Sequence, residues 1–339
     1  MAHMDIFNDN AFSLVSMVQN FTNQPYVPQY LKGDFSTISS TTRSISIESR
    51  DGVLTLIPVS ERGTPSVEGG TEPRKLRYFD TVRLAKGDTI QAVEVANIRK
   101  FGTESELQQV MDVVAERSAR LKDDKEVTLE YMRLGVLQGK FLNPKDGSVI
   151  YDWFSEFGVT QAPEVNFALG TASTDVPSLI RKEKRRIIKA SAGAITPQTK
   201  VKALCGEEFY DKLINHASIK ETYLNWQAAA QLRQEQGNVF ESFTVAGVEF
   251  VDYRGTDDNS KVAIGTSKCI IYPVGVRDNL VHAQAPADEY MEFVNRKGQE
   301  SYTLIEQDPA TNKQWVRVEC KAYPLMYCAR PKTLGRGKA

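Results

Sequence analysis

The sequence predicts an α+β protein with long extensions, and three observations support this fold class. Strand-like residues between positions 35 and 95 surround a polar stretch that is rich in Gly and Pro. A helical pattern then runs through residues 104–139, with apolar side chains at steps of three and four. A block that mixes strand-like and helix-like segments follows at residues 199–300.

The size and charge of the chain limit what it can bind. At 339 residues it exceeds the usual single core, which favours two domains or one body with long excursions. Its formal net charge of -1 gives no general attraction to nucleic acid or anionic membranes.

The start of the chain lacks the basic and apolar parts of a signal peptide, and no apolar run approaches the ~18 residues of a membrane span. We therefore expect a soluble protein without a membrane partner, and we interpret residues 1–3 as a vector-derived remnant.

The first 95 residues predict extended structure that cannot be stable alone. A short amphipathic helix is expected at residues 12–21, and Pro25 and Pro28 end it. The alternation in STTRSISIES predicts a strand, and Asp51-Gly52 offers a hairpin turn. The polar tip at residues 61–73 then joins two extended arms. Such arms bury too little surface to offset their conformational entropy, so we expect another molecule to cover them.

The long helix is predicted from an apolar line and from its end signals. The line comprises Leu107, Met111, Val114, Ser118, Leu121, Lys125, Leu129, Met132 and Val136. Thr103 and Glu106 match a capping box, and the charged residues 123–126 are expected to kink the helix or to lie at a solvent edge. Gly139 and Lys140 superficially suggest a phosphate-binding loop. The glycine spacing is one residue short and the position follows a helix, so Gly139 is interpreted as a left-handed cap.

Basic residues are concentrated in two places. Residues 181–189 contain six Lys or Arg and one Glu. They indicate either contact with phosphate or an acidic partner, through Arg181, Lys182, Arg185 and Arg186, or an ordinary solvated helix face. For nucleic acid the second interpretation is favoured, with Leu179, Ile180, Ile187 and Ile188 turned inward. The C-terminal segment carries Arg330, Lys332, Arg336 and Lys338 and predicts a mobile basic tail.

Residues with catalytic chemistry do not form a recognisable motif. His216 and His282 have no neighbour at metal-site spacing, and the four cysteines form no CxxC pair. Cys205 is expected to be a buried, reduced thiol. We therefore predict no catalytic residue, no cofactor and no metal site.

The chain resembles the major capsid proteins E of tailed phages. The similarity runs in order through FTNQPYVPQYL, SISIESRDGVLTLIPVSERGTP, LEYMRLGVLQGK, FGV, VEFVDYRG, APADEYMEFVNRKGQESY and PLMYCARP. The resemblance implies the Hong Kong 97-type capsid fold. Its parts would be an N-terminal arm at 1–34, an extended loop at 35–95, a peripheral domain at 96–198 with a spine helix at 104–139, an axial domain at 199–300, and a peripheral return with the basic tail at 301–339.

The resemblance also implies a function and partners. The chain would be a non-enzymatic major capsid protein that forms hexamers and pentamers of an icosahedral shell around double-stranded DNA. A scaffolding protein, a portal and a decoration protein are the expected partners, with assembly in the host cytoplasm and a final place in the virion. Arg62, Arg74, Lys75 and Arg77 are candidates for intersubunit pairing. The tip lacks a lysine for covalent stitching, which favours a decoration protein.

Two other functions remain open on the sequence. An encapsulin-like shell would share the fold but enclose enzyme cargo. A cytoplasmic αβ enzyme would assemble its active site from distant residues of the 199–300 block. Electron microscopy distinguishes shells from a compact monomer, and neighbouring genes for a portal, maturation protease and large terminase distinguish a phage from an encapsulin.

Overall fold

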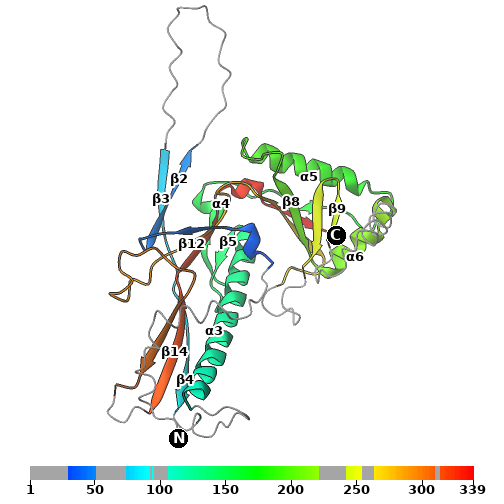
Figure 1. Cartoon of the computed structure of the whole chain (residues 1–339). Coiled ribbons are helices and arrows are strands. Elements are labelled where there is room, and N and C mark those ends of the chain that lie inside the picture. Colours follow the sequence, from blue (N-terminus) through cyan, green and yellow to red (C-terminus); the bar gives the residue numbers. More distant parts are fainter. Residues whose placement is uncertain are drawn as a thin grey trace, which may run out of the picture. The chain divides into compact units, whose positions relative to one another are not determined.

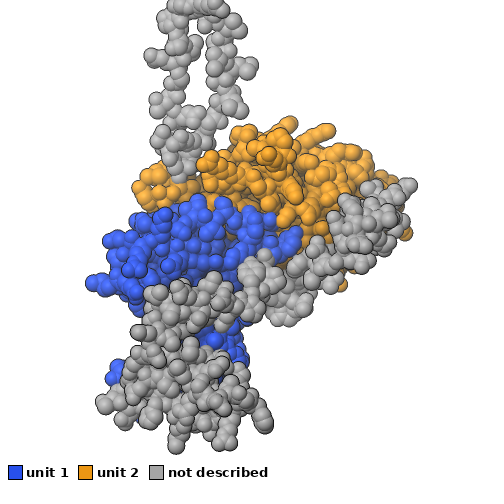
Figure 2. Space-filling view, in the orientation of Figure 1, with its two compact units in different colours: residues 1–45, 80–133, 282–326 blue, residues 46–79, 134–281, 327–339 orange. Residues whose placement is uncertain are grey.

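The computed structural model describes residues 30–50, 74–91, 94, 106–220, 242–253, 263–309 and 314–339 (Figure 1). The chain divides into two compact units, which Figure 2 distinguishes by colour. Unit 1 contains residues 1–45, 80–133 and 282–326, and unit 2 contains residues 46–79, 134–281 and 327–339. None of the helices in the described ranges is long and apolar enough to cross a membrane. The predicted helix at 12–21, the capping residue Thr103 and the polar tip at 61–73 lie outside the described residues.

Unit 1 is built on a three-stranded antiparallel sheet beside a long helix. The strand order is β13 (Tyr302–Gln307), β14 (Trp315–Ala322) and β4 (Leu84–Gln91). Helix α3 lies alongside β4 and β14 in Figure 1, and ion pairs join it to β4: Arg117 to Asp88 at 2.7 Å and Lys86 to Asp124 at 2.6 Å.

Helix α3 (Glu106–Leu137) confirms the long helix expected at 104–139. Its 32 residues span roughly 48 Å at 1.5 Å per residue. Every position of the predicted apolar line whose side chain is described is buried: Val114, Ser118, Leu121, Lys125, Leu129, Met132 and Val136. The helix continues through residues 123–126, and both Lys125 and Glu126 are buried. The predicted solvent edge is therefore wrong for these two residues, because ion pairing within unit 1 compensates their charges.

The end of α3 has the predicted glycine cap. Gly139 has a φ of 84° and donates its N–H to the Val136 carbonyl at 2.8 Å. The next residues form β5 (Lys140–Leu142), which pairs with β6 (Val149–Asp152). The short helix α4 (Trp153–Glu156) follows, and the Asp152 carboxylate accepts hydrogen bonds from the first amides of that helix.

Unit 2 contains a mixed six-stranded sheet. The order is β7 (Val165–Asn166), β16 (Gly335–Lys338), β11 (Lys268–Val274), β8 (Lys200–Cys205), β10 (Val248–Asp252) and β9 (Ser242–Val245). The β10–β8 and β16–β7 pairs are parallel, and the other described pairs are antiparallel. Helices α5 (Val176–Ala190) and α6 (Glu207–Asn215) contribute Ile180, Ile187, Phe209 and Leu213 to the apolar core of this sheet.

The predicted mobile tail is wrong. Residues 335–338 form β16, an interior strand between β7 and β11, and the 3-10 turn η4 (Pro331–Thr333) precedes it. Gly337 lies so close to the Phe167 ring and the Cys269 sulfur that a Cβ atom would collide with both. Basic composition suggested a solvated end, but the small glycines between the cations allow the backbone to enter the sheet.

The remaining described strands form two smaller sheets. β1 (Ser36–Ser39), β12 (Leu280–Gln284) and β15 (Pro324–Cys328) form a three-stranded sheet, and the turn η3 (Lys32–Asp34) precedes it. β2 (Ser44–Arg50) pairs with β3 (Arg74–Asp80). The two arms expected at the base of the extended loop therefore do pair, while the proposed turn at 51–52 lies outside the described residues.

Candidate functional site

The basic face of α5 is the first candidate surface. Arg181, Lys182, Arg185 and Lys189 are exposed, while Val176, Ile180, Glu183 and Ile187 are buried. Asp175 caps the helix by accepting the Ser178 N–H at 3.1 Å. Ile188 was expected to point inward but is 43% exposed, because it lies about 100° around the helix from Ile187. The helix thus presents a cationic face outward and an apolar face inward.

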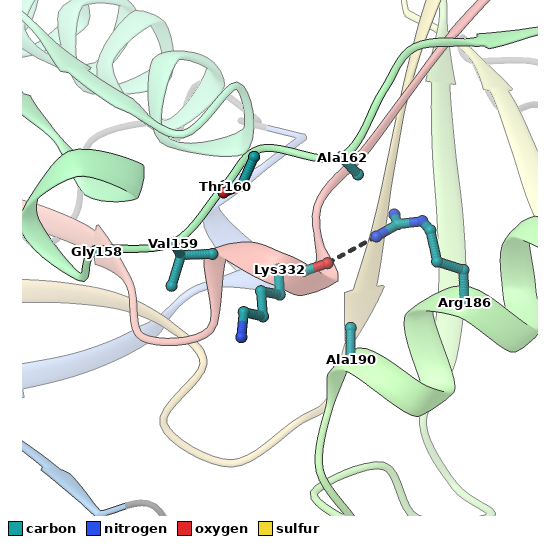
Figure 3. Close-up of a pocket in the computed structure, with 7 residues that line it drawn as sticks. All are labelled: Gly158, Val159, Thr160, Ala162, Arg186, Ala190 and Lys332. Atoms are coloured by element: carbon teal, nitrogen blue, oxygen red, sulfur yellow. Dashed lines mark hydrogen bonds between the residues drawn. The ribbon is translucent and has the colours of Figure 1, made fainter.

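Arg186 differs from the other predicted cations because contacts within its own chain hold it. Its guanidinium donates to Glu183 Oε1 at 2.6 and 2.9 Å, to the Lys332 carbonyl at 2.8 Å and to the Leu334 carbonyl at 3.0 Å. Figure 3 shows Arg186 reaching from α5 to Lys332. The cavity between them has a volume of about 330 Å³ and is lined by Gly158, Val159, Thr160, Ala162, Arg186, Ala190 and Lys332. Arg186 therefore fastens the segment before β16 to α5.

The β2–β3 arms contain the second set of predicted residues. Arg62 lies outside the described residues, and for Arg74 and Lys75 only the backbone of β3 is described. The Arg77 guanidinium lies 5.6 Å from the centre of the Phe157 ring of the same chain, a cation–π distance. Arg77 is thus half-buried against its own unit.

The base of β3 is anchored by an aromatic cluster in unit 2. The Phe79 ring is 4% exposed and packs edge-on against Tyr151 and Trp153, with ring centres 5.3 and 5.2 Å apart. Because successive side chains of a strand alternate between faces, Leu76 and Tyr78 point the other way. They are 53% and 67% exposed. The arm is therefore fixed at its base and apolar on its free face.

A group of charged and mostly buried residues in unit 1 lies around Leu31. We call Lys32, Lys125, Glu126, Glu130, Arg133, His282 and Glu300 the α3 ionic cluster. The buried Leu31 donates its N–H to Glu130 Oε1 at 3.0 Å, and Arg133 pairs with Glu130 at 3.3 Å. Lys32 pairs with Glu300 and lies 3.9 Å from Glu126. These contacts bind the last residues of the predicted N-terminal arm, which ends at residue 34, to the helix.

The cluster shifts the pKa values of two of its members. Burial lowers the pKa of His282 to about 3, and the nearby Arg133 acts in the same direction. Burial opposes ionisation of Glu300, but the hydrogen bond from Lys32 and the charge of Lys125 hold the pKa of Glu300 below its usual value. At neutral pH the cluster therefore contains a neutral histidine among paired ions.

A second charged group in unit 1 lines a small cleft. Arg83 pairs with Glu289 at 2.6 Å, and Lys321 pairs with Glu319 at 2.7 Å. Burial raises the pKa of Tyr323 to about 12. The adjoining cavity of about 130 Å³ is lined by Arg43, Thr81, Arg83, Pro286, Asp288, Glu289 and Tyr323. At this cleft Arg83 is therefore paired with Glu289, and beside it Lys321 is paired with Glu319.

The histidines and cysteines occupy packing positions. His216 is buried and hydrogen-bonds through Nε2 to the Thr171 carbonyl at 3.0 Å and through Nδ1 to Ser218 at 2.9 Å. The four cysteines are free and buried, which confirms the expected burial of Cys205. Across the described ranges, no group of three or more His, Cys, Asp or Glu could hold a metal ion.

Sequence reasoning missed the α3 ionic cluster as a unit. One signal was available: Lys125 stands on the predicted apolar line of α3, where a charge needs a partner. The partners Lys32, His282 and Glu300 come from distant segments, so spacing along the chain could not identify them. The charged cleft of unit 1 that Arg83 and Glu289 line was likewise invisible in the sequence.

The comparison with protein families shows which family the chain belongs to. The sequence matches the family described as phage major capsid protein E over residues 13–339. The chain belongs to this family. Its predicted role as a phage major capsid protein is thereby confirmed, and the family match favours that role over the encapsulin-like and enzymatic alternatives.

Individual relatives of this capsid protein E chain agree with the family match. The chain is 26% identical over 329 residues to the major capsid protein of Pseudomonas phage KPP10, covering 91% of this chain and 90% of the relative. It is 22% identical over 332 residues to the major capsid protein of Salmonella phage Felix O1, covering 89% of each.

Solved capsid structures confirm the Hong Kong 97-type fold of this family member. The capsid protein of cyanophage P-SCSP1u has a TM-score of 0.53 at 11% identity and covers 94% of this chain and 91% of its own. The mature capsid of bacteriophage PhiM1 has a TM-score of 0.50 at 8% identity, and the match covers 93% of this chain and 88% of the PhiM1 chain. At such low identity the similarity concerns the fold alone. As a member of the capsid protein family, the chain is a virion component.

Proposed function

We propose that the chain assembles as hexamers and pentamers into an icosahedral shell that packages double-stranded DNA. The observation that carries the proposal is the β2–β3 pair, fixed at its base by Phe79 and apolar on its free face at Leu76 and Tyr78. An arm of this kind gains its missing burial when it lies on another subunit. The division into the arm 1–34, loop 35–95, peripheral domain 96–198, axial domain 199–300 and return 301–339 belongs to the same proposal.

The shell is proposed to be held by many weak contacts rather than by catalysis or covalent linkage. Arg62, Arg74 and Lys75 are the candidates for pairing with a neighbouring copy, whereas Arg77 has a partner in its own chain. An exposed pair contributes at most ~1 kcal/mol, so the number of pairs and the apolar burial must provide the stability. Assembly in the host cytoplasm, with a scaffolding protein, a portal and a decoration protein, completes the proposed setting.

Electron microscopy of the purified full chain, alone and co-expressed with the phage's scaffolding protein, tests shell formation. We expect closed particles or capsomers. A compact monomer under both conditions, at concentrations where other capsid proteins assemble, would contradict the proposal.

We further propose that the exposed cations of α5 contact packaged DNA through its phosphates. Arg181, Lys182 and Arg185 lie on one helix face, and charge complementarity favours a polyanion there. The triple variant R181E/K182E/R185E should form shells but bind DNA more weakly, with a smaller dependence of affinity on salt. Lys140, Lys145 and Arg277 are exposed cations elsewhere in unit 2, so K140E/K145E/R277E is a control of equal charge. Equal DNA binding by the two variants would refute a role for α5.

A further inference from the structure

Two of the four cysteines lie directly opposite each other in the six-stranded sheet. Cys205 ends β8, and its register partner in the antiparallel strand β11 is Cys269. Directly opposed residues of an antiparallel pair point to the same face of the sheet. The side chains of Cys205 and Cys269 are 0% and 1% exposed in the apolar core of unit 2. The two thiols are therefore neighbours in a protected place.

The backbone hydrogen bonds define which type of pair this is. Gly206 donates its N–H to the Lys268 carbonyl at 2.9 Å, so the hydrogen-bonded pair is the adjacent one. The Cys205 carbonyl instead accepts the Tyr253 N–H at 3.0 Å, on the β10 side. Cys205 and Cys269 thus form a non-hydrogen-bonded pair, in which Cα atoms are typically ~4.5 Å apart. Disulfides require a Cα separation of ~4.4–6.8 Å, so the backbone already has a suitable spacing.

The surroundings of the two thiols explain why a reaction would be slow. Across the sheet, Cys269 is next to Gly337, and the Cys269 sulfur lies where a side chain at position 337 would be. Burial raises the pKa of Cys205 well above its usual value, and the neighbouring Cys269 adds to this effect. The Cys205 thiol is consequently protonated and slow to react while the sheet is closed. Because Cys205 is the last residue of β8, fraying of that strand end gives a reagent access.

The other two cysteines do not share this arrangement. Cys320 on β14 lies opposite Thr303 and Lys86. The Cys328 sulfur lies 3.8 Å from the Asn279 side-chain oxygen. Cys320 and Cys328 are therefore natural internal controls for thiol chemistry in the same chain.

We propose that Cys205 and Cys269 form a cross-strand dithiol that a small-molecule disulfide, such as oxidised glutathione, converts to an intramolecular disulfide. One deprotonated thiol attacks the oxidant and forms a mixed disulfide, releasing the first reduced thiol of the oxidant. The second cysteine then attacks the protein sulfur of that mixed disulfide, releasing the other thiol. The protein loses two electrons and two protons, and the oxidant gains both.

The product would link β8 covalently to β11 and so restrict the unfolded state of unit 2. The timing of this reaction rests on the proposed assembly in a host cytoplasm. There, the Cys205–Cys269 pair would stay reduced during shell formation and become oxidised after release. The disulfide itself does not depend on that setting. Its detection therefore tests the chemistry separately from the capsid proposal.

The test uses the purified full chain, incubated with oxidised glutathione in mild urea that lets strand ends open. Peptide mapping without reduction should recover one linked peptide pair containing Cys205 and Cys269. The midpoint of thermal unfolding should rise by roughly 5–10 °C and return to its starting value after addition of dithiothreitol. C328A should keep this shift, whereas C269A should lose it.

Each variant is compared with itself before and after oxidation, so a loss of stability in C269A does not hide the result. Alkylation of Cys205 in the same urea verifies that the reagent reaches the site. Accessible thiols that yield no Cys205–Cys269 peptide, or a thermal shift that persists in C269A, would overturn the proposal.

Discussion

At the scale of single residues, the unusual feature is charge placed inside unit 1. Arg133 is completely buried and pairs with Glu130, while Lys125 pairs with Glu126 at 2.8 Å. Removing one partner of a buried pair leaves an uncompensated charge, which is costly. The α3 ionic cluster therefore specifies where the segment around Leu31 and Lys32 meets the helix more than it adds net stability.

His282 should make the stability of unit 1 sensitive to mild acid. Its pKa is about 3 in the folded chain and about 6.5 when unfolded. Between these values the unfolded state binds a proton that the folded state does not, so stability falls as pH falls below about 6.5. The free energy of unfolding should decrease by up to about 1.4 kcal/mol per pH unit through this group.

Urea denaturation at pH 7 and pH 5.5 measures the effect. In His282→Gln the decrease between the two pH values should be smaller by about 1 kcal/mol than in the parent chain. The groups that face His282 are Arg133 and Lys125 of α3, Lys32 and Glu300. Since the carboxyl Glu300 titrates below this window, an unchanged pH dependence in the variant would show that His282 is not the responsible group.

Residue patterns predicted burial well and partners poorly. Cys205 and the α3 line were assigned correctly to the core, because apolar periodicity reports which face is covered. Arg77 and Arg186 were candidates for contact with other molecules, and in the structure each also contacts its own chain. A cation in a sequence carries no information about whether a distant carbonyl or aromatic ring lies within reach.

At the scale of elements, the end of α3 depends on a glycine that fulfils two requirements. Gly139 has a positive φ, and a Cβ at this position would also collide with the Phe154 ring. Gly158 has a φ of 64° but nothing within 4 Å of its virtual Cβ. Comparing these two glycines therefore separates the cost of the left-handed backbone from the cost of crowding at the Cβ position.

Gly139→Ala should therefore destabilise the chain more than Gly158→Ala does. Both variants incur about 1–2 kcal/mol for the left-handed backbone, and only the first adds about 1–3 kcal/mol for overpacking. Chemical denaturation of the two variants gives the difference directly. Equal losses would mean that the Phe154 ring moves aside without cost.

The strand β16 leads to an element-scale prediction about the C-terminus. Deleting residues 335–339 removes an interior strand, the hydrogen bond from the Phe167 N–H to Lys338, and the bond from the Ala339 N–H to Ser267. At about 1 kcal/mol for each lost backbone hydrogen bond, we expect a loss of several kcal/mol. Thermal unfolding measures it, with the exposed Lys338→Ala as a silent control. A truncated chain as stable as the parent would restore the mobile-tail interpretation.

At the scale of the whole molecule, the extended loop should matter for assembly and little for folding. Deleting residues 66–71 shortens the polar tip but leaves the Phe79 anchor in place. The variant should unfold at nearly the same temperature as the parent while its yield of closed particles falls severalfold. Calorimetry and negative-stain microscopy of one preparation give both results. Particles of normal size, yield and stability would show that the tip does not contribute to the shell.

The sequence by itself determined the α+β class, the long helix, the two strand-like arms of the loop and the family. These follow from local periodicity and from short motifs in a fixed order, which the chain carries without reference to its folded partners. It predicted the apolar residues of α3 that face the core, whereas the solvent edge expected at Lys125 and Glu126 was wrong.

Only the tertiary structure decided which residues the buried charges pair with and where residues 335–338 lie in the sheet. β16 enters an interior position because Gly335 and Gly337 fit beside α5 and β11, and the α3 ionic cluster joins residues separated by up to 268 positions. Cys205 and Cys269 are neighbours only because β8 and β11 pair in one register. Contacts of this kind depend on the path of the backbone through space, which periodicity along the sequence does not encode.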